Sequence, residues 1–258
     1  MDNLLVGIFM GNKDLGYYDK GYKLMLYPVQ NLTFVITPVM HPILSEHQHN
    51  KAHIYNQYIK VVKILSLIGV FITAYCFFTS REIILIMFGN QWENSILCFQ
   101  ILSLSIFFQI TVSSAGAIYQ SLGNTKTMFK SGIVFTIVMV ICILCGVSTG
   151  EINKLAIFVT LGLIIKFLTD YYFLIEKTFG FSVIKFYKIF IPDMIILLLL
   201  FTVMYIAGTF KLDNIYLSAV FKLSICTITY FVGLLVTKQY LYLFMILPSK
   251  MRNKIARR

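Results

Sequence analysis

The 258-residue sequence is poor in charged residues, which make up 13% of it, while hydrophobic residues make up 58%. A soluble domain carries roughly 25% charged residues, and a chain with so few cannot cover a water-facing surface. The scarcity of charge therefore excludes a soluble globular fold. A disordered chain is excluded as well, because disordered segments are poor in hydrophobic residues. We conclude that the sequence encodes an integral membrane protein.

Residues that carry chemistry are also scarce. The five cysteines all lie in apolar stretches and do not indicate a disulfide framework. The four histidines cluster between residues 41 and 53 without a cysteine or paired carboxylates, so we expect neither a metal nor another cofactor. The sequence contains no nucleophile–base pair and no glycine-rich phosphate loop. It therefore does not predict an enzyme.

What the chain does have is long hydrophobic runs. Crossing a hydrocarbon core of about 30 Å takes about 20 apolar residues in a helix. Six runs are long enough: 61–79, 96–119, 131–148, 155–175, 189–208 and 215–236. A seventh, 23–43, contains prolines and polar residues, and we expect its helix to be broken there, with its polar groups facing protein or water. An eighth, 4–10, is short, and we expect the chain to begin inside a helix.

The sequence thus predicts an all-α polytopic membrane protein with about eight helical segments, the first of them truncated. Two further short pieces, 81–89 and 238–248, are expected at the membrane interface or as helix extensions.

The net charge of +11 predicts the orientation of the chain. Lysine and arginine concentrate in cytoplasmic loops, which explains the positive charge without a nucleic-acid partner. One set of alternate loops carries fourteen, at positions 51, 60, 63, 126, 130, 177, 185, 188, 238, 250, 252, 254, 257 and 258. The other set carries six, at positions 13, 20, 23, 81, 154 and 211. This bias predicts that both termini are cytoplasmic and that the basic tail contacts anionic headgroups.

Residues 2–46 carry a recognisable string, DNLLVGIFMGNKDLGYYDKGYKLMLYPVQNLTFVITPVMHPILSE, and MFGNQW follows at 87–92. This part of the chain resembles the Wzx-type, WzxC-like polysaccharide-export flippases of the multidrug/oligosaccharidyl-lipid/polysaccharide exporter superfamily. The resemblance covers about residues 2–123. The matching positions are Asp2, Asn3, Gly7, Gly11, Leu15, Gly16, Tyr17, Tyr18, Tyr22, Leu24, Pro28, Gln30, Asn31, Pro38, Pro42, Leu44 and Ser45.

The resemblance implies a fold of two helix bundles that face a central cavity in the membrane. The eight segments match the second bundle only, so we expect the C-terminal half of such a transporter. We divide it into a truncated helix and external loop (1–22), a motif-bearing part (23–123), the remaining transmembrane helices (124–236) and the basic tail (237–258).

Lys166 and Asp170 are ionisable residues inside a predicted span, spaced i, i+4 on one helix face. They could line a cavity, where they would meet an anionic headgroup or act as a proton-coupled switch. They could equally form a structural ion pair, or Asp170 could lie at the interface.

A second group of candidates flanks the interrupted helix. Lys20, Lys23 and Tyr22 combine cations for phosphate with aromatic faces for sugar rings, although snorkelling lysines in an aromatic belt give the same pattern. Gln30 and Asn31 lie between Pro28 and Pro38. Their amides could bind sugar hydroxyls in a wet cavity, or bond to backbone carbonyls freed by the prolines.

The resemblance implies a bacterial inner-membrane protein that flips undecaprenyl-pyrophosphate-linked oligosaccharide for cell-surface polysaccharide synthesis. Its expected partners are that lipid-linked oligosaccharide, membrane lipids, and a separately encoded N-terminal half or a second copy of the chain. The alternatives are a truncated remnant that transports nothing and a half-transporter that needs a partner. A membrane enzyme that polymerises glycosyl units is disfavoured, because the longest loops have only about 13–20 residues.

Overall fold

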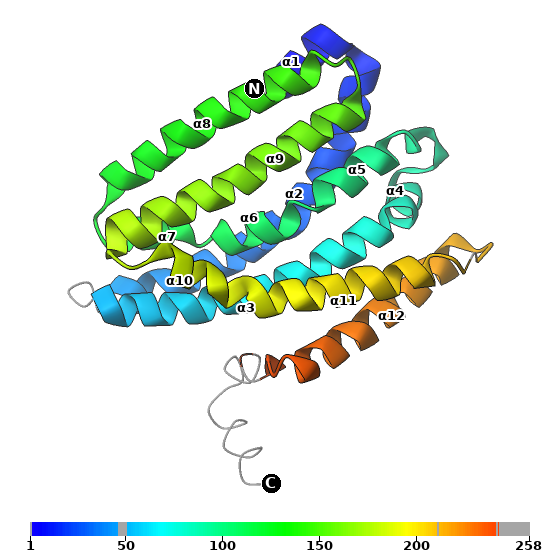
Figure 1. The fold of residues 1–258 in the computed structure, drawn as a ribbon. Coiled ribbons are helices and arrows are strands. Elements are labelled where there is room, and N and C mark those ends of the chain that lie inside the picture. Colours follow the sequence, from blue (N-terminus) through cyan, green and yellow to red (C-terminus); the bar gives the residue numbers. More distant parts are fainter. Residues whose placement is uncertain (1, 46–50, 211, 241, 243–258) are drawn as a thin grey trace.

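The computed structural model describes residues 2–45, 51–210, 212–240 and 242, and every regular element in that part of the chain is a helix (Figure 1). The first half forms α1 (Asp2–Met10), α2 (Asn12–Ser45), α3 (Lys51–Phe78), α4 (Ser80–Phe88), η1 (Asn90–Trp92), α5 (Ser95–Ser103), α6 (Ile106–Val112) and α7 (Ala115–Ser121). The second half forms α8 (Thr125–Val147), α9 (Ile152–Tyr171), the π-helix η2 (Tyr172–Phe179), α10 (Val183–Tyr187), η3 (Lys188–Phe190), α11 (Ile191–Ala207) and α12 (Ile215–Val236). His47 and His49 lie outside the described residues, as does the basic tail beyond residue 242.

The helices form one elongated bundle (Figure 1). The hairpin of α8 and α9 lies at one edge, α11 and α12 lie at the other beside α3, and α5 and α6 run between them (Figure 1). One hydrophobic cluster joins α3 to α9, η2 and α11, and a second joins α2 to α5, α6 and α9. Two adjoining cores therefore hold the bundle together.

The six long hydrophobic runs are confirmed as helical, and by length and composition five or six of them can span a membrane. Five described helices are long and apolar enough to cross a membrane, and a bent pair over residues 95–121 has the composition for a sixth, as a broken span or a re-entrant loop. The predicted bounds of α12, 215–236, are those of the structure, while α3 and α8 begin ten and six residues earlier than predicted. The added turns of α3 and α8 contain lysines, so these helices continue beyond the apolar runs that the hydropathy detects.

The run predicted over residues 96–119 is helical but not one continuous helix, because it is broken between α5 and α6 with a bend of 46°. At the break, serine hydroxyls compete with backbone N–H groups for the carbonyl oxygens of the preceding turn. Ser103 donates to the carbonyl of Gln100 at 2.7 Å, and Ser105 donates to that of Leu102 at 2.6 Å. Hydrogen bonds of a side chain to a carbonyl in the preceding turn bend helices. Hydropathy alone does not detect this bend.

The prediction of a break at the prolines of the seventh segment is also wrong. Helix α2 continues through Pro28 and Pro38 for 34 residues. An interior proline removes one helical hydrogen bond and costs about 3 kcal/mol. Burial of Met25 and Val29 against the bundle, on either side of Pro28, offsets this cost. Residues 12–22, expected in an external loop, are the first turns of α2, which follows a turn at Gly11 with φ of 89°.

A buried ion pair joins α3 to α11. The Lys63 ammonium donates to a carboxylate oxygen of Asp193 at 2.7 Å, and the Ser66 hydroxyl donates to the other carboxylate oxygen at 2.7 Å. The side chains of Lys63 and Asp193 are 2% and 0% exposed. The assignment of Lys63 to a cytoplasmic loop is therefore wrong. Removing Lys63 leaves 14 − 1 = 13 lysines and arginines assigned to one side of the membrane and 6 to the other. Lys13, Lys20 and Lys23 are in α2 and not in a loop, so the second number does not rise and the excess on the first side remains.

A second buried ion pair joins α4 to α12. The Lys222 ammonium donates to Glu82 at 2.5 Å and to the carbonyl of Phe78 at 2.9 Å, and the Ser218 hydroxyl donates to the same Glu82 oxygen. Breaking a buried pair by removing one partner costs about 3–5 kcal/mol. The two pairs thus fix the α11–α12 hairpin to the rest of the bundle.

Candidate functional site

One face of α2 carries an exposed stripe of polar and aromatic side chains. The stripe follows helical spacing and consists of Lys23, Tyr27, Gln30, Asn31 and Phe34, and the apolar side chain of Val35 is exposed beside it. The opposite face is buried in the bundle and consists of Tyr18, Gly21, Met25 and Val29. We call the exposed face the polar stripe of α2.

The lysine and the two amides of the polar stripe do not suit contact with lipid. With 34 residues, α2 is long enough to cross the membrane, but it is not among the helices that are apolar enough to do so. Polar side chains inside a membrane face a bundle interior or a water-filled cavity. The stripe is exposed on this chain, so we take it as the candidate wall of such a cavity.

The structure divides the predicted cluster of Lys20, Lys23 and Tyr22. The Lys20 ammonium lies 4.8 Å from the ring of Phe88 and 5.0 Å from that of Trp92. This contact holds α2 against the end of α4 and against η1. The ring of Tyr22 stacks on buried Tyr18 at 5.6 Å.

Lys23 is the member of this cluster that remains accessible. Its side chain is 69% exposed and forms an ion pair with Asp19 at 2.7 Å. An exposed i, i+4 ion pair is worth only a few tenths of a kcal/mol. Lys23 can therefore exchange this partner for an anionic ligand at little cost.

Gln30 and Asn31 are both exposed on the polar stripe. The Asn31 amide donates to the carbonyl of Tyr27 at 2.8 Å, which is the kind of backbone contact that one of the two sequence-based interpretations expects. Within the described residues, Gln30 has no hydrogen-bond partner. Most of the hydrogen-bonding capacity of these two amides is therefore free for a ligand.

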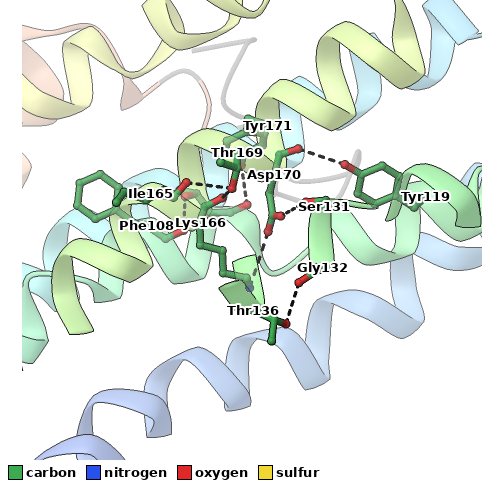
Figure 2. A network of polar contacts seen from close by, with 11 residues as sticks. Phe108, Tyr119, Ser131, Gly132, Thr136, Ile165, Lys166, Thr169, Asp170 and Tyr171 are labelled. Atoms are coloured by element: carbon green, nitrogen blue, oxygen red, sulfur yellow. Dashed lines mark hydrogen bonds and ion pairs between the residues drawn. The ribbon is translucent and has the colours of Figure 1, made fainter. Parts of the chain in front are cut away.

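Lys166 and Asp170 lie elsewhere, in a cavity of about 290 Å³ between α6, α7, α8 and α9 (Figure 2). They share one face of α9, as predicted, and their charged atoms are 3.8 Å apart. The Ser131 hydroxyl of α8 donates to the Asp170 carboxylate, and the Tyr119 hydroxyl donates to the Asp170 backbone carbonyl at 3.2 Å. Asp170 thus connects α9 to α7 and α8.

The two groups of predicted residues do not form one site. The described lining of the Lys166–Asp170 cavity comes from α6 to α9 and includes no residue of α2. The sequence did not single out Ser131 or Asp193. Ser131 lies at the edge of an apolar run, where serine is common, and only the fold places it beside Asp170. Asp193 carried a usable signal, because it is a carboxylate inside a predicted span.

Comparison with known proteins agrees with the resemblance found in the sequence. Residues 1–97 match a protein family described as polysaccharide biosynthesis protein. The chain is 22% identical over 158 residues to the teichuronic acid biosynthesis protein TuaB of Bacillus subtilis, covering 60% of this chain and 32% of that protein. It is 23% identical over 182 residues to the amylovoran biosynthesis protein AmsL of Erwinia amylovora, covering 69% of this chain and 46% of that protein.

Among solved structures, the chain is similar to the lipid II flippase MurJ in its inward closed conformation. The TM-score is 0.69 at 17% sequence identity, over 88% of this chain and 48% of that chain. The chain therefore has the fold of about half of MurJ, and it spans less than half the length of each of these relatives. The predicted resemblance to polysaccharide-export proteins is confirmed, and the protein is a multi-pass membrane protein.

Proposed function

We propose, from this similarity, that the chain is one half of a membrane transporter that flips lipid-linked oligosaccharides for the synthesis of a cell-surface polysaccharide. The membrane is the bacterial inner membrane, and the carrier lipid is undecaprenyl pyrophosphate. The protein acts as a transporter and not as an enzyme. Both termini lie on the cytoplasmic side, as the loop charges predict.

The observation that carries the proposal is the polar stripe of α2. A helix that presents a lysine and two amides on its exposed face belongs beside water, and a transport cavity supplies that water within the membrane. In this cavity Lys23 neutralises the pyrophosphate by charge-assisted hydrogen bonds. Gln30 and Asn31 exchange hydrogen bonds with sugar hydroxyls, and the prenyl tail stays in the bilayer.

The cavity needs a second wall. Alternating access requires two units that rock against each other around a shared site. A separately encoded N-terminal half or a second copy of this chain would supply the unit that faces the polar stripe. The competing proposal, a remnant that inserts into the membrane without transporting, predicts that the stripe has no function.

The test uses a strain that lacks its own flippase and expresses this chain with the candidate N-terminal half. Surface polysaccharide and the lipid-linked precursor that accumulates in the inner membrane are both measured. We expect Lys23→Gln to reduce transport about tenfold, the cost of one charge-assisted hydrogen bond. Gln30→Leu and Asn31→Leu remove neutral hydrogen bonds and reduce transport less.

Lys154→Gln is the matched control, because Lys154 is an exposed lysine in another ion pair, 2.8 Å from Glu151 and away from the polar stripe. Protein level in the membrane is measured for each variant. Unchanged transport in all three stripe variants, at unchanged protein level, contradicts the proposed role of the stripe. Absence of transport with every N-terminal half tested supports the non-transporting remnant.

A further inference from the structure

The Lys166–Asp170 cavity adjoins a groove on the exposed side of α8. The groove has a volume of about 780 Å³ and shares Met128 and Gly132 with the lining of the cavity. A Cβ atom added to Gly132 would have no other atom within 4 Å, so the junction between cavity and groove is open. Figure 2 shows Gly132 on the same helix as Ser131, which bonds to Asp170.

The groove is apolar along its length and polar at one end. Exposed Phe129, Ile133 and Ile137 line it, while Thr125 and Lys126 lie at the start of α8. Ser131 is six residues into α8, about 9 Å along the helix axis. The headgroup layer of a bilayer is about 5–8 Å deep on each side. The apolar run of α8 begins at Ser131, so we infer that the cavity lies near the boundary between headgroups and acyl chains and that the groove continues along Ile133 and Ile137 into the acyl-chain region.

The cavity holds one positive and one negative charge, and both keep unused bonding capacity. In the described part of the chain the Lys166 ammonium donates no hydrogen bond, and it lies 5.0 Å from the ring of Phe135. Its distance of 3.8 Å from Asp170 is too long for a hydrogen bond. The side chain of Lys166 is 35% exposed and that of Asp170 is 13% exposed. A ligand with both charges can thus reach both groups.

We propose that this cavity and groove bind a resident phospholipid with a zwitterionic headgroup that ends in a primary ammonium, such as phosphatidylethanolamine. Lys166 binds the phosphate, and Asp170 accepts hydrogen bonds from the ammonium. One acyl chain lies in the groove along Phe129, Ile133 and Ile137. The site is separate from the polar stripe of α2, and the proposal does not depend on the transport function.

Charge and hydrogen bonding together select this lipid over three others. The anionic headgroup of phosphatidylglycerol is attracted by the Lys166 ammonium but repelled by the Asp170 carboxylate. The same repulsion acts on a pyrophosphate-linked carrier lipid. Phosphatidylcholine has the same charges as phosphatidylethanolamine, but its quaternary ammonium has no N–H group to donate to Asp170. A carboxylate that accepts charge-assisted hydrogen bonds therefore favours the primary ammonium.

The purified chain is incubated with equal amounts of the three phospholipids, and the lipids that it retains are counted by native mass spectrometry. We expect phosphatidylethanolamine to be retained about tenfold over the other two. Asp170→Asn and Lys166→Gln each reduce this preference about tenfold, the effect of one charge-assisted hydrogen bond. Gly132→Trp fills the open junction and abolishes retention.

Two controls keep the test independent of folding. Gly132→Ala adds only a methyl group in open space and retains the lipid, and Lys154→Gln removes a lysine from an ion pair outside the cavity. Melting curves establish that Gly132→Trp is folded. Equal retention of the three lipids overturns the proposal, as does a preference for phosphatidylglycerol. Retention that is unchanged in both Gly132→Trp and Asp170→Asn overturns it too.

Discussion

At the scale of single residues, Glu82 shows how a buried carboxylate in this protein is kept charged. Burial raises the pKa of Glu82, but hydrogen bonds from Lys222 and Ser218 and the Lys222 charge together hold the pKa below its ordinary value of 4.5. A group whose pKa is lower in the folded protein than in the unfolded chain stabilises the fold when it is ionised. Glu82 therefore contributes fully at neutral pH.

This contribution gives an expected pH dependence. The stabilisation by Glu82 is complete above its unfolded pKa and is lost as the pH falls through the lower folded pKa. We expect Glu82→Gln to lower the free energy of unfolding by about 3 kcal/mol at neutral pH, because Lys222 loses its buried partner. The measurement is the difference in melting temperature between wild type and Glu82→Gln, from pH 7 down to the lowest pH at which the wild type is still folded.

The difference should stay constant down to about pH 4.5 and shrink below it. Glu151→Gln, in an exposed pair with Lys154, is the control and should change the melting temperature little at any pH. A wild-type advantage that grows on acidification would mean that the pKa of Glu82 is raised, against our assignment.

At the scale of helices, the hairpin of α8 and α9 depends on close contact at Gly146. A Cβ atom added to Gly146 would lie 2.9 Å from the Cα atom of Leu155 and 2.7 Å from its side chain. A backbone atom cannot move aside alone, so the two helices would have to separate. We expect Gly146→Ala to destabilise the protein by about 1–3 kcal/mol, a typical cost of overpacking, measured as a lower melting temperature.

Gly132→Ala on the same helix is the matched control. Gly132 faces open space, so alanine there gains up to about 1 kcal/mol of helix propensity without a clash. The two substitutions should therefore have opposite signs. If Gly146→Ala is as stable as Gly132→Ala, the close contact of the two helices is absent in the membrane.

The elements also show which features of the fold hydropathy can predict. The six long apolar runs are sufficient to predict six spans, because the cost of burying polar backbone in lipid dictates helices of that length. The bend near Ser105 depends on hydroxyl-to-carbonyl bonds, and the continuity of α2 depends on packing around Met25 and Val29. A hydropathy profile predicts neither the bend nor the continuity of α2, because it averages over the individual side chains on which both depend.

The same distinction holds for the candidate site. The pairing of Lys166 with Asp170 followed from their i, i+4 spacing, which is local. The partners Ser131 and Tyr119 come from other helices, 39 and 51 residues away along the chain, and only the fold brings them to Asp170. Lys20 and Lys23 are neighbours in sequence, yet one lies against Phe88 and Trp92 while the other is exposed.

At the scale of the whole molecule, the orientation in the membrane follows from the distribution of charge. After Lys63 is removed from the count, the sequence assigns thirteen lysines and arginines to one side of the membrane and six to the other. The loop near Ser182 belongs to the first set, and the α8–α9 turn near Ser148 belongs to the second. Positive loops stay in the cytoplasm, so Ser148 is expected outside and Ser182 inside.

Single cysteines test this orientation with little disturbance, because Ser148 and Ser182 are both exposed and serine is close to cysteine in size. In a background without the five native cysteines, a membrane-impermeant maleimide should label Ser148→Cys in intact spheroplasts. It should label Ser182→Cys only after the membrane is opened. Labelling of Ser182→Cys in intact spheroplasts would reverse the orientation. The Lys166–Asp170 cavity, which lies toward the Ser182 end of α9, would then open to the outer leaflet.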